Sequence, residues 1–327
     1  MTKTTPGRPF PVESLFPELA PYRARTTRLH PRPGRPGMRD SHVGGPMLWP
    51  DEEPWPVCEG PHAPVTEGYA PEEIRRARAS GERPKERTRA AGDGALEAVP
   101  FIGLAQFFRR DVPGLAAGPG GTDLVQLFHC PLSHDPQGAQ PWLLRWRRVD
   151  ETERAGGFRA ATAPPEVPLL PWPDELPVPC VLHPEEVDSY PWAERDTLPA
   201  PLMARIDAWD DAQTAAHGPD TVGYQYDLSI PPGWRVGGHP TWASTGPLHV
   251  VCEACATPMR LLLTADGHET NSPAHTWLPA EDREHAARLE TRRAVLQPTG
   301  LRFGRDHDLH VFVCPADPGH PPEWVLS

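Results

Sequence analysis

The stretch that decides the fold is Val236-Gly237-Gly238-His239-Pro240-Thr241-Trp242, because Val43-Gly44-Gly45-Pro46-Met47-Leu48-Trp49 repeats its pattern near the start of the chain. In both stretches two glycines and a proline precede a tryptophan. Glycine permits positive φ angles or close backbone approach, and proline stiffens the exit from the turn. A tryptophan side chain can anchor such a turn on a hydrophobic core. The sequence therefore predicts two turns of the same kind.

The similarity continues downstream in the same order. Pro100-Phe101-Ile102-Gly103-Leu104-Ala105-Gln106 aligns with Pro258-Met259-Arg260-Leu261-Leu262-Leu263-Thr264. Leu127-Phe128-His129-Cys130-Pro131 then aligns with Val311-Phe312-Val313-Cys314-Pro315. Three ordered landmarks at similar separations indicate an internal duplication. The alternative is coincidence in a sequence rich in proline and glycine.

The composition favours a β-rich fold. The chain of 327 residues can form one large domain or two ordinary ones. Its 46 prolines interrupt helices and interior strands, while its 11 tryptophans argue against wholesale disorder. We therefore predict an α+β, β-rich fold in which two related antiparallel-sheet halves are joined with few helices.

The charge and the termini limit the classes of partner. A formal net charge of −12 disfavours direct binding to nucleic acid, whose phosphates need basic surface, and permits a basic protein partner. Residues 1–20 lack the apolar core of a signal peptide, and no apolar run approaches membrane-spanning length. We expect a cytoplasmic protein that does not enter a membrane, in which the 6 cysteines are thiols or metal ligands rather than disulfides.

Composition shifts divide the chain into four segments. Residues 1–40 are expected to form an N-terminal arm that lies on the first half. The first repeat spans 41–159 and contains a charged, mobile insertion at 60–98. A proline-rich connector with a helix follows at 160–221, and the second repeat spans 222–327.

The hydrophobic pattern predicts regular elements within these segments. The expected strands are 99–108, 122–130, 141–149, 259–264 and 308–314. The expected helices are a short one beginning at Pro71, an amphipathic one at about 198–216, and one running from Pro279 to Leu296.

The second repeat carries a candidate zinc site. Cys252-x-x-Cys255 follows a turn and precedes an expected strand, so its two thiolates can occupy adjacent corners of a tetrahedron. Cys314 at the end of the last strand supplies a third thiolate, and His320 a fourth donor, with Asp317 as the alternative fourth ligand. We predict a structural zinc site. Reduced cysteines without metal remain an alternative, as does a redox dithiol, although thioredoxin-type sites place C-x-x-C at a helix N-terminus.

The first repeat offers a parallel set. Cys58 and His62 follow the first Gly-Gly turn, and Cys130 and His134 follow the strand that corresponds to the one ending at Cys314. If the duplication holds, these residues form a second Cys2His2 site. The alternative is a pair of ordinary loop histidines.

Catalytic motifs are largely missing from the sequence. It contains no G-x-S-x-G, no H-E-x-x-H and no phosphate-binding glycine loop. Asp306-His307-Asp308 and Asp266-Gly267-His268-Glu269 are His-acid clusters that could serve in acid-base chemistry or bind metal, or could be solvated turns. A zinc ion with four protein ligands has no open position for water and is therefore not catalytic.

The motifs of the first half resemble those of a known family. Val43-Gly44-Gly45-Pro46 with Trp49-Pro50, followed by Leu104-Ala105-Gln106, is similar to the signature of the YwqG-like family (DUF1963). In the second half, Cys252-x-x-Cys255-x-x-Pro258-Met259 and Val311-Phe312-Val313-Cys314 resemble the same family and the programmed-cell-death-2-like proteins.

This resemblance implies a duplicated, β-rich domain. The eukaryotic relatives are implicated in ribosome maturation as dedicated chaperones of a small-subunit ribosomal protein, and some bacterial ones lie in toxin–immunity neighbourhoods. We expect a non-enzymatic, chaperone-like module that binds a protein or peptide and is stabilised by structural zinc. The alternative is a metal-dependent hydrolase that uses His and acid residues at the seam between the halves.

Overall fold

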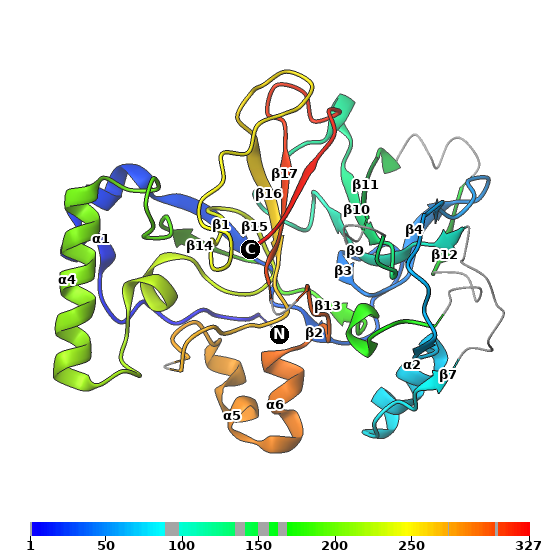
Figure 1. Cartoon of the computed structure of the whole chain (residues 1–327), viewed down its shortest axis with the longest axis horizontal. Coiled ribbons are helices and arrows are strands. Elements are labelled where there is room, and N and C mark those ends of the chain that lie inside the picture. Colours follow the sequence, from blue (N-terminus) through cyan, green and yellow to red (C-terminus); the bar gives the residue numbers. More distant parts are fainter. Residues whose placement is uncertain are drawn as a thin grey trace.

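Two six-stranded antiparallel sheets form the centre of the molecule (Figure 1). The computed structural model describes residues 2–88, 98–134, 141–149, 157–162, 169–273, 275–304 and 307–327. Sheet 1 has the order β2 (Arg32–Pro33), β13 (Cys180–Val181), β3 (His42–Val43), β9 (Ile102–Phe108), β10 (Leu124–His129), β11 (Trp142–Arg147). Sheet 2 has the order β14 (Glu185–Ser189), β1 (Ala24–Arg28), β15 (Arg235–Gly237), β16 (Arg260–Ala265), β17 (Leu309–Val313), β18 (Glu323–Leu326).

Smaller elements surround these sheets in the part of the chain that the structure describes. Three two-stranded sheets pair β4 (Met47–Pro50) with β12 (Phe158–Ala161), β5 (Val57–Cys58) with β8 (Val99–Pro100), and β6 (Glu67–Gly68) with β7 (Arg87–Thr88). The α-helices are α1 (Val12–Leu15), α2 (Pro71–Ser80), α4 (Ala200–His217), α5 (Arg283–Ala287) and α6 (Leu289–Leu296). The 3-10 helices are η1 (Pro17–Tyr22), η2 (Pro119–Gly121), η3 (Pro173–Glu175) and η5 (Ala280–Asp282), and η4 (Tyr224–Ser229) is a π-helix. The β-rich α+β class predicted from the sequence is confirmed.

The first four strands have the same order in both sheets when each sheet is followed from the edge strand that comes latest in its repeat, which is β11 or β18. Sheet 1 runs β11-β10-β9-β3 and sheet 2 runs β18-β17-β16-β15. The fifth place differs in origin, because β13 of the connector pairs with β3, whereas β1 from the N-terminal segment pairs with β15. Sheet 2 therefore incorporates a strand from the opposite end of the chain.

Both sheets also contain a β-bulge at the same place. Between β9 and β10 the register shifts so that Leu104 lies opposite no residue. Between β16 and β17 the register shifts in the same way around Leu262. Both leucines are buried in the core, and an extra residue of this kind bends its strand and increases the local twist. The two ladders are thus distorted at corresponding points.

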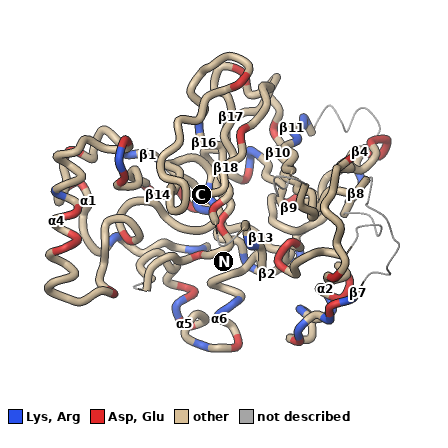
Figure 2. The backbone as a smooth tube through the Cα atoms, viewed as in Figure 1, with Lys and Arg blue, Asp and Glu red and all other residues tan. Residues whose placement is uncertain are grey.

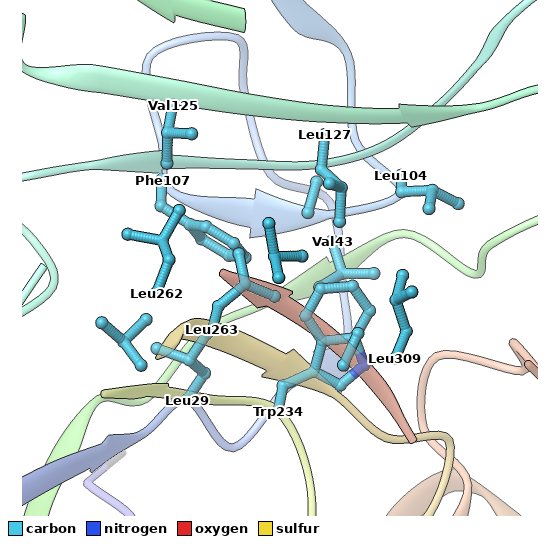
Figure 3. Packing of buried hydrophobic residues seen from close by; sticks show 14 of the residues in the cluster. Leu29, Val43, Leu104, Phe107, Val125, Leu127, Trp234, Leu262, Leu263 and Leu309 are labelled. Atoms are coloured by element: carbon cyan, nitrogen blue, oxygen red, sulfur yellow. The ribbon is translucent and has the colours of Figure 1, made fainter. Parts of the chain in front are cut away.

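The main hydrophobic core lies between the two sheets (Figure 3). Sheet 1 contributes Phe107 and Leu127, and sheet 2 contributes Leu263 and Leu309, with Trp234 beside them. Burying each such side chain stabilises the fold by roughly 1.5–3 kcal/mol. The halves are therefore joined by a shared core rather than by a linker alone.

The glycine turns enter this core with matching backbone angles. Gly44 has a φ of 69° and Gly237 a φ of 68°, in the left-handed region that other residues rarely adopt. A Cβ at Gly44 would lie 2.7 Å from the carbonyl oxygen of Val178, while a Cβ at Gly238 would lie 2.8 Å from Thr26 Cβ. Each turn thus needs glycine for its angle or for a close neighbour.

Only the end of the N-terminal arm lies on the first half, as the sequence led us to expect: Arg32–Pro33 forms β2 of sheet 1, while the rest of the arm packs elsewhere. Phe16 and Leu19 pack with Leu202 and Ile206 of α4, and α1 lies beside α4 in Figure 1. The following β1 joins sheet 2. The expectation was wrong for the part of the arm up to β1, because α4 also presents an apolar face, which this part covers.

The predicted strands are confirmed, with 99–108 divided into β8 and β9. The helix at about 198–216 is also confirmed as α4. The single helix from Pro279 to Leu296 is wrong, because Arg288 adopts an extended conformation between α5 and α6. Leu289 is 86% exposed, so this segment has no continuous apolar face that would hold one straight helix.

Within the insertion at 60–98, α2 begins at Pro71 as predicted and buries Ile74 and Ala77. Residues 89–97 of the insertion lie outside the described residues. The mobility of this segment stays a prediction.

Candidate metal centres

Two groups of four Cys and His side chains each meet at one point. The first group is Cys58, His62, Cys130 and His134, and the second is Cys252, Cys255, Cys314 and His320. Within each group one potential ligand atom per residue lies within 4.8 Å of all the others. These are the two sets predicted from the sequence, and each could hold a metal ion.

The Cys252–Cys255 turn directs its backbone toward a sulfur atom. The amides of Ala254 and Cys255 donate to Cys252 Sγ, and the amide of Ala256 donates to the Cys252 carbonyl oxygen at 2.8 Å. Ala256 has a φ of 56°, an unfavourable conformation for alanine that surrounding contacts must hold. The turn therefore presents both thiols on one side, as a zinc-binding knuckle does.

The separations in the second cluster suit tetrahedral coordination. Cys255 Sγ lies 3.5 Å from Cys314 Sγ, and Cys252 Sγ lies 3.4 Å from His320 Nδ1. Zinc–ligand bonds of about 2.0–2.3 Å in a tetrahedron require ligand atoms roughly 3.3–3.8 Å apart. All six cysteines of the chain are free thiols rather than disulfides. The donor set and its spacing therefore fit zinc.

The choice between the two candidate fourth ligands favours His320. Its Nδ1 faces the sulfur atoms, while its Nε2 lies 3.8 Å from Asp317 Oδ2. A carboxylate on the far side of a ligating histidine commonly fixes the orientation of its ring. Asp317 is thus placed to support His320 rather than to replace it.

The first cluster is built from two loops. Cys58 ends β5 and His62 follows it, while Cys130 and His134 follow β10. Cys58 Sγ lies 3.2 Å from His134 Nε2, and the rings of His62 and His134 are perpendicular with centroids 4.9 Å apart. The two loops are also joined by a backbone hydrogen bond from Ala63 to Ser133. The histidines are therefore part of a cluster rather than ordinary loop residues.

The electrostatics of the two clusters differ. Burial raises the pKa of the Cys130 thiol to about 12. In contrast, the hydroxyl and amide of Thr257 lower the pKa of the exposed Cys255 to about 6. The pKa of His320 is raised by the neighbouring Cys314 and Cys255. A bound cation would stabilise thiolates in both clusters, and the first cluster needs it more because both of its thiols are buried, whereas Cys255 of the second is exposed.

The seam between the sheets holds a network of charges that sequence reasoning missed. His30 is buried, with Nε2 3.2 Å from Glu185 and Nδ1 3.3 Å from Glu269. Arg32 binds Glu269 and Asp282. Burial acts to raise the pKa of Glu269, but Arg32 and His30 lower it to about 2. This carboxylate is held ionised by cations and is unsuited to act as a general acid.

Within the described residues, neither His-acid cluster of the sequence brings three potential metal ligands together. His268 Nδ1 lies 3.7 Å from Asp266, and Glu269 turns instead toward His30. His307 bonds Ser244, and Asp306 lies outside the described residues. No signal in the sequence pointed to His30, because its partners are 155 and 239 positions away.

No protein-family model matches the chain, and no curated protein matches it in sequence. Within the described residues, no helix has both the length and the apolar character needed to cross a membrane.

Proposed function

We propose that this chain is a non-enzymatic protein-binding module, of the YwqG-like type that its motifs resemble, in which structural zinc closes each of two related halves. The observation that carries the proposal is the pair of four-donor clusters. Four protein ligands complete a zinc tetrahedron and leave no position for a reacting water. The metal would therefore hold loops together rather than perform chemistry.

The proposal includes an internal duplication, which the shared strand order and the matching bulges support. A pair of buried polar side chains at the same place in each sheet supports the duplication further. Gln106 faces Gln126 across sheet 1, and Thr264 faces His310 across sheet 2. Gln126 Nε2 donates to the carbonyl of Leu48, and His310 Nε2 donates to that of Thr241. Leu48 and Thr241 each precede the tryptophan of a Gly-Gly stretch.

The tryptophans of the two Gly-Gly stretches also have corresponding partners in the two sheets. Trp49 packs edge-on against Phe128 with ring centroids 5.7 Å apart, and Trp242 stacks on Phe312 at 6.4 Å. Each phenylalanine stands two residues before the cluster cysteine, Cys130 or Cys314. In each half, the turn, the polar pair and the metal cluster thus form one connected unit.

Zinc in these clusters would contribute directly to folding. The first site would join the loop after β5 to the end of β10, and the second would join the Cys252 turn to the end of β17. Structural zinc sites in small domains contribute on the order of 10 kcal/mol to folding at neutral pH. A rigid pair of sheets is the scaffold that a binding surface needs.

The proposal is tested by finding the partner and following its fate. The zinc-loaded chain serves as bait in extract of its native cell, and the bound protein is identified by mass spectrometry and made in pure form. We expect a stoichiometric complex that forms from the two pure proteins and leaves the partner chemically unchanged. Cleavage or modification of the partner by the pure chain would instead support the hydrolase alternative.

Cobalt substitution separates the two functions without a partner. A closed site with three thiolates gives tetrahedral cobalt spectra that do not change when phosphate or a hydroxamate is added. A hydrolase requires an open position, so its spectrum would respond to these metal-binding anions.

A further inference from the structure

A cavity of about 880 Å³ lies beside the Gly44 turn, between α2 and the connector. Its lining includes Met47 and Ile102, and the connector residues Leu176–Pro179 form one wall. This wall is fixed, because the amide of Val178 donates to the carbonyl of Thr299 at 2.7 Å. The cavity belongs to neither metal cluster, and its size is within the usual range of about 300–1,000 Å³ for ligand sites.

The walls of this cavity are mostly apolar. Four prolines line it, which are Pro46, Pro71, Pro177 and Pro179. Proline rings present flat apolar surface and lack an amide hydrogen to donate. Extended peptides with apolar side chains suit such walls, as proline- and aromatic-lined grooves in other domains illustrate.

The charged residues of the cavity stand on α2. They are Glu72, Arg75 and Arg78, and acidic residues of the helix come before the basic ones (Figure 2). The Arg78 guanidinium donates to the carbonyls of Leu176 and Pro173, which fixes its position. Burial and the nearby Arg293 lower the pKa of Arg78 to about 10. The charged side chains that line the cavity thus sum to one positive charge, although the whole chain has a net charge of −12.

Arg75 is the cation available for a ligand. Its side chain is exposed and forms no hydrogen bond or ion pair with any residue in the described part of the chain. The neighbouring Arg78 repels it, and this repulsion falls when an anion binds between them. A carboxylate at this end of the cavity would satisfy Arg75.

An exposed aromatic residue extends the apolar surface beyond the cavity. Trp172 is 64% exposed and adjoins Pro173, whose carbonyl accepts the hydrogen bond from Arg78. A small molecule filling the cavity would leave Trp172 in water. A peptide segment that leaves the cavity on the α2 side would cover it.

We propose that this groove binds an extended segment of a partner protein, in which apolar side chains fill the proline-lined cavity and an adjacent acidic side chain pairs with Arg75. The proposal rests on the proposed function as a protein-binding module and names its binding site. Trp172 packs against the apolar flank of the bound segment. The acidic charge of the segment complements the arginines, so raising the salt concentration weakens binding.

The test uses the full zinc-loaded chain and a displayed library of short linear peptides. We expect the selected peptides to combine apolar residues with Asp or Glu. Arg75→Glu should weaken their binding about tenfold or more, since it replaces attraction by repulsion. Trp172→Ala should weaken binding to a smaller extent. Both side chains are exposed, so both variants should fold.

The matched control is Arg145→Glu, which makes the same charge change at an exposed position of β11 away from the cavity. If the peptides bind the wild type, Arg75→Glu and Trp172→Ala equally well, the groove is not their binding site. The chain would then still be a protein-binding module, with its site elsewhere. A library that yields no binding peptide overturns the groove, while a partner captured as a folded protein would still support the module.

Discussion

The two metal clusters occupy corresponding ends of β10 and β17 but differ in donors and exposure. The first has two thiols and two imidazoles, of which only His134 is partly exposed. The second has three thiols and one imidazole, and Cys255 is exposed. With zinc bound and the thiols deprotonated, the first site is neutral and the second carries one negative charge. Two sheets with the same strand order would thus be closed at the same position by a buried neutral site in one and by a partly exposed anionic site in the other.

If both clusters bind zinc, this difference implies different roles for the two ions. A neutral site can be buried without an uncompensated charge, whereas an anionic site is favoured where water reaches it. The first cluster is therefore suited to form part of the core, and the second to join a surface turn to the last strands. Exchange of the ion with solvent should be faster at the second site.

Removal of both ions should have the largest effect. We expect purified protein to contain two zinc ions per chain, one for each cluster. A strong chelator should lower the melting temperature by at least about 10 °C, because structural zinc contributes on the order of 10 kcal/mol to folding. Elemental analysis and thermal melts check this result. Protein that lacks zinc, with melting unaffected by chelator, would contradict both sites.

Single cysteine variants should separate the two clusters. Cys130→Ser and Cys255→Ser should each reduce the zinc content from two ions to one. Cys130→Ser should destabilise the fold more, by several kcal/mol, because it leaves a hydroxyl in a buried site. Denaturant unfolding measures the difference. Because the two sheets share one core, the loss at either site should lower the stability of the whole molecule.

Cys180→Ser is the control for these variants. Cys180 is buried but belongs to neither cluster, so this variant should keep both zinc ions. If Cys255→Ser retained two ions while Cys180→Ser lost one, the assignment of ligands would be wrong.

The metal clusters could be predicted from the sequence because their residues stand in rare motifs at fixed offsets. Cys252-x-x-Cys255 is local, and Cys130 and Cys314 each close an apolar strand. The alignment of Leu104 with Leu262 likewise followed from proline and leucine spacing, and both residues form the bulges.

Long-range pairing could not be predicted in this way. The strand Ala24–Arg28 has the sequence ARTTR, which shows no apolar alternation, yet it is an interior strand of sheet 2, paired with both β14 and β15. Its burial depends on polar partners such as those of Arg28, which bonds Thr5 and the carbonyl of Trp277. Partners separated by so many residues leave no periodic signal in either segment.

Glycine-to-alanine changes should test whether the two turns are equally constrained. Gly44→Ala should destabilise the protein more than Gly237→Ala, although their φ angles are nearly equal. The new Cβ would lie 2.7 Å from Val178 O in the first case and 3.6 Å from Arg25 O in the second. The angle alone costs about 1–2 kcal/mol, and the clash at Gly44 adds to it.

Gly246→Ala serves as the reference for the angle alone. Gly246 has a φ of 69° and no atom within 4 Å of an added Cβ. In denaturant unfolding, the loss of unfolding free energy in Gly237→Ala should be close to that in Gly246→Ala, and the loss in Gly44→Ala should be clearly larger. Equal costs for Gly44→Ala and Gly246→Ala would mean that the turn can move away from Val178.

The smallest expected effect concerns the buried polar pairs of the two sheets. Only the pair in sheet 2 contains a titratable side chain, His310. His310 occupies the position in sheet 2 that Gln126 occupies in sheet 1, and burial lowers the pKa of His310 to about 3. The unfolded chain binds a proton at this histidine below about pH 6.5, whereas the folded chain does not. The contribution of the neutral His310 to the free energy of unfolding is therefore complete above about pH 6.5 and is lost as the pH falls toward 3.

His310→Gln should remove part of this acid sensitivity by making sheet 2 resemble sheet 1. Between about pH 6.5 and pH 5 the wild type should lose about 1.6 kcal/mol of unfolding free energy through this group, and the variant should not. Denaturant unfolding at both pH values measures the difference, with the exposed His217→Gln as the control that should leave the wild-type loss unchanged. The glutamine can still donate to the Thr241 carbonyl, as Gln126 does to that of Leu48. An equal acid loss in His310→Gln and wild type would mean that other buried histidines, such as His42 and His129, dominate.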